Sequence, residues 1–431
     1  MRAYRKLSLA ILLIASLIGI GLLRAQLQPA ATDIIHTPVN AAPSLAEKLP
    51  IVGTASCSAR GCHGSDAPVE RRDHCLQNEY SLWSRDRHAD AYRTLLSERS
   101  ANIVKQLGGN VKASDDPRCL ACHVTPQLAS LPADSVFAQR EKLFGVGCES
   151  CHGSANDWLV AHTGPDWRQK KSAYAMPDLA DPRVHAKACV GCHVGGNGDV
   201  THDMIAAGHP RLTFEFTSYH ANMPPHWRPH QESEAQLWAT GQLASAEAAL
   251  ALTAKRADAG PWPEFAEYDC FACHHALTAP SWRQSAKRAT KPGELPWGTW
   301  YFVFTRDLTG PSPALDSLAA TMQSLRASRA DANKKAKQAL HDLQTPRVGV
   351  ADADKILDRF KRGTLGVDAS WDSAEQLYLA MHALQPSAGL NQLATERAFV
   401  PGYDGPLSVP SQGRPAFQPS DFIAKLKALA K

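Results

Sequence analysis

Hydrophobic positions follow helical spacing through much of the second half of this 431-residue chain. Residues 234–259 hold one glycine and no proline among alanines and leucines, which predicts one long helix. Beyond residue 300, apolar side chains recur three and four residues apart in two stretches, which predicts amphipathic helices with packing faces. The two stripes are Leu315, Leu318, Met322 and Leu325, and Trp371, Ala374, Leu377, Tyr378 and Met381.

Strand signals are sparse, because few stretches alternate apolar and polar residues. The predicted fold class is therefore mainly α. Residues 401–419 contain five prolines, which predicts an irregular arm, and a short C-terminal helix should begin near Ser420. The region 301–431 has no cysteine, and we expect its helices to cover the rest of the molecule.

The N-terminal segment, residues 1–25, has the pattern of an export signal. Three basic residues precede an uncharged apolar run from Leu7 to Leu23. The run is at the lower end of the length that spans a bilayer, and the one plausible cleavage sequence, LLRA, has leucine three places before the cut. A cleaved signal peptide and an uncleaved membrane anchor both remain open. Residues 26–50, rich in alanine, proline and threonine, are predicted to form an extended tether.

Charge and export limit the classes of partner. Lysine and arginine outnumber aspartate and glutamate by 46 to 42, without a dense basic run. Nucleic acid is therefore not an expected partner. Export implies a periplasmic protein, or one anchored to the inner membrane and facing the periplasm. Membrane contact is expected through the N-terminal segment.

Eleven cysteines would ordinarily form disulfides in an exported protein, but their spacing indicates another use. Four cysteine pairs have the form CxxCH, the attachment sequence of c-type haem, in which two thiols add to the haem vinyl groups and the histidine binds the iron. A structural zinc knuckle is the alternative, but zinc requires no histidine after each cysteine pair. The four motifs are Cys119, Cys122 and His123; Cys148, Cys151 and His152; Cys189, Cys192 and His193; and Cys270, Cys273 and His274.

A fifth candidate motif is wider. Cys57 and Cys62 enclose four residues and precede His63, giving CxxxxCH. A local disulfide beside an incidental histidine is the alternative. The predicted cofactor is therefore five covalent haem c groups, or four if this site carries none, in a multihaem domain over residues 51–300. Cys75 is left without a partner or motif.

Low-spin electron-transfer haems need a second axial ligand, and thirteen histidines lie outside the motifs. His36, His341 and His382 fall outside the cysteine-bearing region and are interpreted as surface or packing residues. From the residues alone, His185, His209, His220 and His275 are favoured as distal ligands, the last because it directly follows a motif histidine. The full set of candidates is His74, His88, His162, His185, His202, His209, His220, His226, His230 and His275.

Three segments resemble the cytochrome c-554 family. They are GVGCESCHG (Gly145 to Gly153) followed by His162, CLACHV (Cys119 to Val124), and WSRDRHADA around His88. The resemblance covers roughly residues 55 to 200. It implies a mostly helical, haem-packed periplasmic protein that carries electrons between nitrogen-cycle enzymes and the membrane.

The resemblance also implies ligand pairs. His162 would bind the haem of Cys57/Cys62, His88 would bind the haem of Cys148/Cys151, and the haem of Cys119/Cys122 would lack a distal protein ligand. Two features depart from the family: the CxxxxCH spacing, and the fifth motif at Cys270 together with the AAGHPRLTFEF segment, which extend beyond a tetrahaem core.

Two function classes follow. The first is an electron carrier that serves redox partner proteins, some of them membrane-bound. The second is a multihaem oxidoreductase with one open iron that acts on a small nitrogen or sulfur compound. The sequence lacks CxxCK, and it lacks HExxH and the phosphate-binding glycine motifs of other enzyme classes. The sequence therefore favours the carrier over the enzyme.

Overall fold

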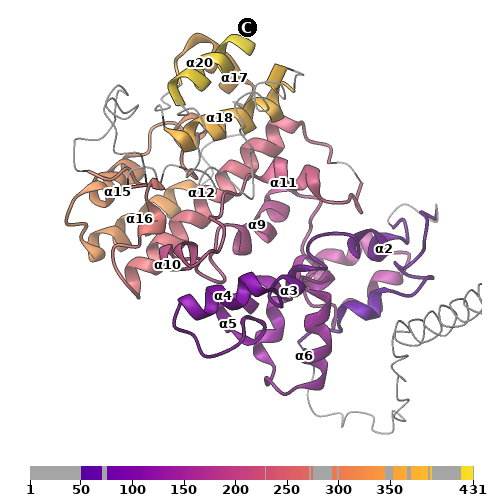
Figure 1. Cartoon of the computed structure of the whole chain (residues 1–431). Helices are drawn as coiled ribbons and strands as arrows, with labels where there is room; N and C mark the ends of the chain where they lie inside the picture. Colours follow the sequence, from indigo (N-terminus) through magenta and orange to yellow (C-terminus); the bar gives the residue numbers. More distant parts are fainter. Residues whose placement is uncertain are drawn as a thin grey trace, which may run out of the picture. The chain divides into compact units, whose positions relative to one another are not determined.

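One long helix, α12 (Glu234–Asp258), organises the second half of the chain. It begins with a capping box, in which Ser233 accepts from the backbone of Gln236 and the Gln236 side chain bonds back to Ser233. The helix is buried on nearly all sides and packs against α9, α11, α16 and α18 (Figure 1). The predicted helix over 234–259 is confirmed to within one residue.

The computed structural model describes residues 50–69, 75–228, 230–270, 273–274, 294–298, 300–344, 353–365, 370–386, 389–390 and 419–430. Within these ranges the chain is mainly helical and contains no sheet, as the sequence predicts; one isolated antiparallel bridge joins Tyr268 and Trp297. None of the described helices combines the length and the apolar character needed to cross a bilayer. The predicted export segment 1–25, the tether up to residue 49 and the arm over 401–418 lie outside the described residues.

Short helices dominate the part of the chain before α12. Their bounds are η1 (Thr54–Cys57), α2 (Glu79–Trp83), α3 (Ala91–Thr94), α4 (Glu98–Gln106), η2 (Ala113–Asp115), α5 (Pro117–His123), η3 (Pro126–Ser130), α6 (Val136–Glu141), η4 (Lys142–Phe144), α7 (Cys148–His152), η5 (Ala161–Thr163), α8 (Trp167–Lys170), η6 (Lys171–Ala173), α9 (Pro182–His193), α10 (His202–Ala206) and α11 (Phe216–Asn222).

Longer helices follow α12, as the apolar stripes predict. Leu315, Leu318 and Met322 are buried, but Leu325 is 82% exposed because α15 ends at Gln323 and Leu325 lies beyond its cap. The stripe from Trp371 to Met381 forms part of α18, and the C-terminal helix begins at Pro419. The bounds are η7 (Phe265–Glu267), α14 (Thr305–Thr309), α15 (Pro313–Gln323), α16 (Arg329–Gln344), α17 (Ala353–Arg362), α18 (Trp371–Leu384) and α20 (Pro419–Leu429).

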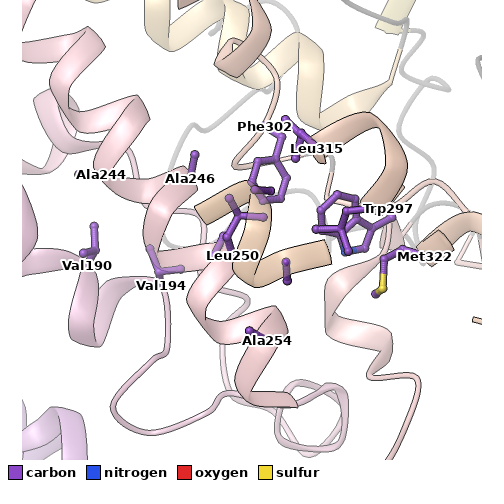
Figure 2. Packing of buried hydrophobic residues seen from close by; sticks show 14 of the residues in the cluster. Val190, Val194, Ala244, Ala246, Leu250, Ala254, Trp297, Phe302, Leu315 and Met322 are labelled. Carbon is purple, nitrogen blue, oxygen red and sulfur yellow. The ribbon is translucent and has the colours of Figure 1, made fainter. Parts of the chain in front are cut away.

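Two apolar clusters meet along α12. Figure 2 shows one of them, which includes Val190 and Val194 of the α9 region, Leu250 of α12, Phe302, and Met322 of α15. The other cluster joins Trp238 and Phe304 to side chains of α17, α18 and α20. Helices from the cysteine-free region therefore pack on the same helix that supports α9. The predicted domain boundary near residue 300 stays a prediction.

Close packing at α12 depends on a glycine. A Cβ added at Gly241 would lie 2.3 Å from the Cβ of Phe216, the first residue of α11. Because that contact is shorter than side chains tolerate, any larger residue would push α11 away from α12. Gly241 thereby fixes the position of α11, which carries His220.

Candidate functional site

The cysteine motifs lie on helical turns that hold their three functional side chains together. Cys148 to His152 form the whole of α7, and Cys189 to His193 form the last turn of α9. Residues three and four apart share one face of a helix, so both thiols and the histidine point to the same side. A single attached group can therefore reach all three side chains of a motif.

Two of these helices begin in the same way. Asp116 caps α5 and Asp181 caps α9; each carboxylate accepts a hydrogen bond from the backbone of the arginine two residues later, with proline at the first helical position. This Asp-Pro-Arg start fixes where each helix begins. In α5 the Cys119–His123 motif follows at once, whereas in α9 one further turn, which contains His185, precedes the motif.

The wider CxxxxCH motif also brings its first cysteine and its histidine together. The His63 amide donates to the Cys57 carbonyl at 3.2 Å, across the four extra residues. At the fifth motif, the His274 amide donates to the Cys270 carbonyl at 2.8 Å. None of the eleven cysteines forms a disulfide. Both motifs therefore keep their cysteine and histidine backbones close together.

Thiols of different motifs lie in contact. A hydrogen bond between Cys57 and Cys148 lowers the pKa of Cys57 and raises that of Cys148. A hydrogen bond between Cys122 and Cys192 lowers the pKa of Cys192 to about 7 and raises that of Cys122. The first motif thus touches the third, and the second touches the fourth. Groups attached to these thiols would be close neighbours.

Three motif histidines face a second histidine at a distance that suits one shared metal ion. Two imidazoles that bind a metal from opposite sides place their ring centroids about 6.2 Å apart, because each bond is about 2.0 Å long and each nitrogen lies about 1.1 Å from its ring centre. The observed centroid separations and interplanar angles are 6.2 Å and 12° for His63–His162, 5.9 Å and 90° for His88–His193, and 6.3 Å and 30° for His202–His274.

The partner of His88 differs from the one that the resemblance implied. His88 was assigned to the motif of Cys148/Cys151, but its ring lies against that of His193, in the motif of Cys189/Cys192. Its backbone does adjoin the third motif, since the His88 carbonyl accepts from the Val146 amide at 2.9 Å. Gly145, with φ of +61°, permits this approach, because a Cβ there would lie 2.4 Å from the same carbonyl. The His88 backbone thus adjoins the motif of Cys148/Cys151, and the His88 side chain lies against the motif of Cys189/Cys192.

The charge of another histidine acts at each of the other two motif histidines, His123 and His152. Burial lowers the pKa of His152 to about 4, and the charge of His226 contributes next. Burial also lowers the pKa of His209, and the positive charge of His123 lowers it further. His209 was a predicted ligand. His226 and His202 were candidates that the sequence did not favour, and no local pattern distinguishes them from the other histidines.

Six of these histidines share a feature typical of metal ligands. Their Nδ1 atoms meet oxygens that can only accept, so Nδ1 carries the proton and Nε2 keeps its lone pair. This donor set fits the axial positions of haem iron. The acceptors are Glu79 for His63 (2.9 Å), Asp86 for His88 (3.2 Å), and the carbonyls of Ala91 for His123 (2.8 Å), Leu159 for His162, Pro210 for His209 (2.8 Å) and Pro224 for His226 (3.3 Å).

Aromatic side chains enclose these histidines. His162 lies edge-on to Trp158 and Trp167, with centroids 5.4 and 6.2 Å apart. His193 stacks on Phe214 at 5.1 Å. Burial among aromatic rings excludes water from a metal ligand and offers apolar surface to a flat macrocycle. These surroundings fit a porphyrin as well as they fit its iron.

A pocket beside the fourth motif combines apolar walls with two guanidinium groups. Val194, Leu252 and Trp300 contribute apolar surface, and Arg211 and Arg256 contribute charge. Arg211 also influences the Cys270 thiol electrostatically. Arg211 is paired with Asp372, and Arg256 is paired with Asp199 and Glu267, so both guanidinium charges are already balanced within the protein.

Two predicted ligands, His185 and His220, lie together, and the charge of the motif histidine His152 also acts on His185. They gather with His230, and a ligand nitrogen from each lies within 4.8 Å of the other two. His275 and His74 lie outside the described residues. The assignment of cysteines and histidines to particular haems stays a prediction.

Comparisons with known proteins bear on the first part of the chain. Residues 72–153 match the family model described as "Cytochrome c554 and c-prime", a range that includes the motifs at Cys119 and Cys148. Cytochrome c-554 of Nitrosomonas europaea is 27% identical over 148 residues, which cover 31% of this chain and 61% of that relative. No solved structure matches.

Proposed function

We propose that this chain, which contains a cytochrome c554/c-prime domain and is a distant homologue of cytochrome c-554, is an exported multihaem cytochrome that passes electrons between periplasmic or membrane-bound redox proteins. The family is one of multihaem c-type cytochromes and implies electron transfer. Because the match spans only part of the relative, the partners and the compartment are proposals. The proposed role in the nitrogen cycle rests on the same resemblance.

One observation carries the choice of carrier over enzyme. A second histidine lies beside His63, His193 and His274 at the spacing of opposed axial ligands. Covalent haem supplies one-electron chemistry, and two axial histidines leave its iron no position for a substrate. Histidine pairs at three of the five motifs would therefore close those irons to substrate, which supports electron transfer over catalysis.

The proposed route follows the contacts between motifs. The Cys57 and Cys148 thiols are hydrogen-bonded, as are the Cys122 and Cys192 thiols. Haems held by these cysteines would be neighbours. Electrons would then pass among four motifs, with the fifth at Cys270 beside Arg211.

The number of haems is tested by intact mass. Protein matured by a c-type haem assembly system should weigh about five haem masses more than the processed polypeptide. The Cys57→Ala/Cys62→Ala variant should lose one haem and no more. A mass equal to that of the bare chain would refute the multihaem proposal, and four haems would show that the CxxxxCH motif carries none.

Turnover distinguishes the carrier from the second candidate, an oxidoreductase with one open iron. The reduced protein should pass its electrons to an oxidised cytochrome but should not turn over hydroxylamine, nitrite or sulfur oxyanions. Turnover of any of these faster than about 1 s⁻¹, which is within the usual range for enzymes, would favour the oxidoreductase. The absence of electron exchange with any cytochrome would contradict the carrier.

A further inference from the structure

We infer that His185, His220 and His230 form a non-haem site for a divalent late transition metal such as Zn²⁺. The three side chains come from separate elements: His185 from α9, His220 from α11, and His230 from the segment that enters α12. The inference rests on the proposed function, in which other histidines serve as the axial ligands of the haems.

The ring separations distinguish this cluster from the axial pairs. Three imidazoles around one tetrahedral metal place their centroids about 5.1 Å apart, whereas two opposed imidazoles place theirs about 6.2 Å apart. The three observed separations are 5.1 Å for His185–His220, 5.4 Å for His185–His230 and 5.4 Å for His220–His230. All three match the tetrahedral value within a few tenths of an ångström. The cluster therefore has the shape of three ligands on one side of a single ion.

The nitrogens are also placed to share a metal. His185 Nδ1 lies 3.2 Å from His230 Nε2, close to the separation of about 3.3 Å between two ligands of a tetrahedral zinc ion. His220 Nε2 is buried and has no hydrogen-bond partner. A buried nitrogen without a partner is costly, and a metal ion would satisfy it. The distance and the unpaired nitrogen point to the same ligand.

Two of the three rings, those of His185 and His220, are held neutral. Burial and the charges of the neighbouring histidines lower the pKa of His185 to about 3, and the same causes lower that of His220 to about 4. Neutral imidazole is the form that binds metal. The neutral state of these imidazoles agrees with the ring and nitrogen distances, and the geometric argument does not depend on it.

Aromatic walls hold the cluster in place. The Trp227 centroid lies 4.6 Å from that of His220 and 5.9 Å from that of His185. Phe216, which Gly241 allows to pack directly on α12, lies 5.3 Å from His185. Fixed rings lose little entropy when they bind, so the fold prepares this arrangement before the metal arrives.

The donor set selects the class of metal. Three neutral nitrogens suit Zn²⁺ and Cu²⁺, whereas Ca²⁺ and Mg²⁺ require oxygen ligands. Three histidines also leave the fourth tetrahedral position for water or another small ligand. Zn²⁺ is the probe of choice because it has no redox chemistry to mix with that of the haems.

The experiment measures zinc against iron in the intact holoprotein. Wild-type protein is equilibrated with Zn²⁺, desalted, and analysed for zinc and iron by elemental mass spectrometry. Haem iron serves as the internal standard. We expect one zinc per molecule. The His230→Gln and His220→Ala variants should bind Zn²⁺ roughly 100-fold more weakly or worse, because loss of a direct ligand exceeds the effect of losing an outer-shell partner.

A matched control and a second readout decide the result. His382→Ala removes an exposed histidine from α18 and should leave one zinc bound. The electron paramagnetic resonance spectrum of each variant should show the same low-spin haems as wild type. Wild-type protein without zinc, or variants that retain it, would overturn the site. A new high-spin haem in His220→Ala or His230→Gln would also overturn it, because the residue would then be an axial haem ligand.

These outcomes separate the metal site from the proposed function. A molecule with five low-spin haems and no zinc would leave the electron carrier in place and refute only the three-histidine site. A molecule with one zinc and rapid turnover of a nitrogen compound would refute only the carrier.

Discussion

The imidazole of His88 meets that of His193 edge-on, with centroids 5.9 Å apart and ring planes at 90°. Asp86 orients His88 by accepting from its backbone amide at 3.0 Å and from Nδ1 at 3.2 Å. The rings of His63 and His162, in contrast, are within 12° of parallel. When each pair binds a haem iron, perpendicular imidazoles make the iron dxz and dyz orbitals nearly equal in energy, whereas parallel imidazoles separate them. The two haems should therefore differ in their magnetic anisotropy.

The first prediction concerns the variant His88→Ala. Loss of the distal ligand should convert the haem of Cys189/Cys192 from low spin to high spin. Because its imidazoles are perpendicular, the ferric signal that disappears should be the strongly anisotropic one, while the rhombic signal of the parallel His63–His162 pair stays. Electron paramagnetic resonance of the oxidised protein measures both.

His382→Ala serves as the control, since that histidine is exposed on α18 and far along the chain from any motif. Loss of a rhombic signal in His88→Ala would refute the His88–His193 pair. An unchanged spectrum would remove His88 from the ligands altogether.

The second prediction concerns the haem of Cys119/Cys122, for which the resemblance implied an open iron. The charge of His123 acts on His209, whose Nδ1 donates to the Pro210 carbonyl and leaves Nε2 free to bind. We therefore expect wild-type protein to show no high-spin ferric haem and no binding of carbon monoxide when reduced. His209→Ala should gain both properties at one haem. A high-spin signal already present in wild type would restore the open iron and favour the oxidoreductase.

Local features of this fold could be predicted from sequence, and distant pairings could not. The motif spacing places two thiols and a histidine on one helical face, and the composition of residues 234–259 predicts α12, because both depend on neighbours along the chain. The contact between His88 and His193 depends instead on how α9 packs beside the segment that precedes α3. Histidines such as His202 and His226 carry no local mark of a ligand, since their role arises from the position of another segment.

The third prediction concerns the residue that orients His63. Glu79 accepts from His63 Nδ1 at 2.9 Å and from the Leu76 amide at 2.6 Å. Burial opposes ionisation of Glu79, but the hydrogen bonds from His63 and from backbone amides outweigh it and lower the pKa of this carboxyl to about 2. The carboxylate is therefore charged throughout the physiological range, where it strengthens His63 as a ligand and stabilises ferric iron.

Replacing Glu79 with glutamine should raise the midpoint potential of the haem of Cys57/Cys62 by about 60 mV, the one-electron equivalent of about 1.4 kcal/mol for a charge-assisted hydrogen bond. Haem content and spin state should not change. Potentiometric titration followed by optical spectra measures the shift. Between pH 5 and pH 8 the shift should be constant, because a pKa near 2 keeps Glu79 ionised; a shift that vanishes within this range would contradict the proposed role.

The fourth prediction concerns a buried ion pair that ties α18 to the segment after α10. Arg211 donates to both carboxylate oxygens of Asp372, at 2.7 and 2.8 Å, and the Asp372 side chain has no exposed surface. Burial opposes the charge on Arg211, but Asp372 outweighs it and raises the pKa of the guanidinium. The variant Asp372→Asn leaves a buried positive charge without its partner, so it should lower the free energy of unfolding by about 3–5 kcal/mol. Urea denaturation followed by far-ultraviolet circular dichroism measures this loss.

An exposed pair provides the matched control for this prediction. Arg306 and Asp316 also form a close ion pair, at 2.6 Å, but their side chains are 46% and 56% exposed. Solvent screens such a pair, so Asp316→Asn should cost less than about 1 kcal/mol. The double variant Arg211→Met/Asp372→Leu should recover most of the stability, because it removes both charges and keeps the volume. Equal losses in Asp372→Asn and Asp316→Asn would mean that the buried pair contributes no more than a surface contact, and that α18 is held in place by its apolar face alone.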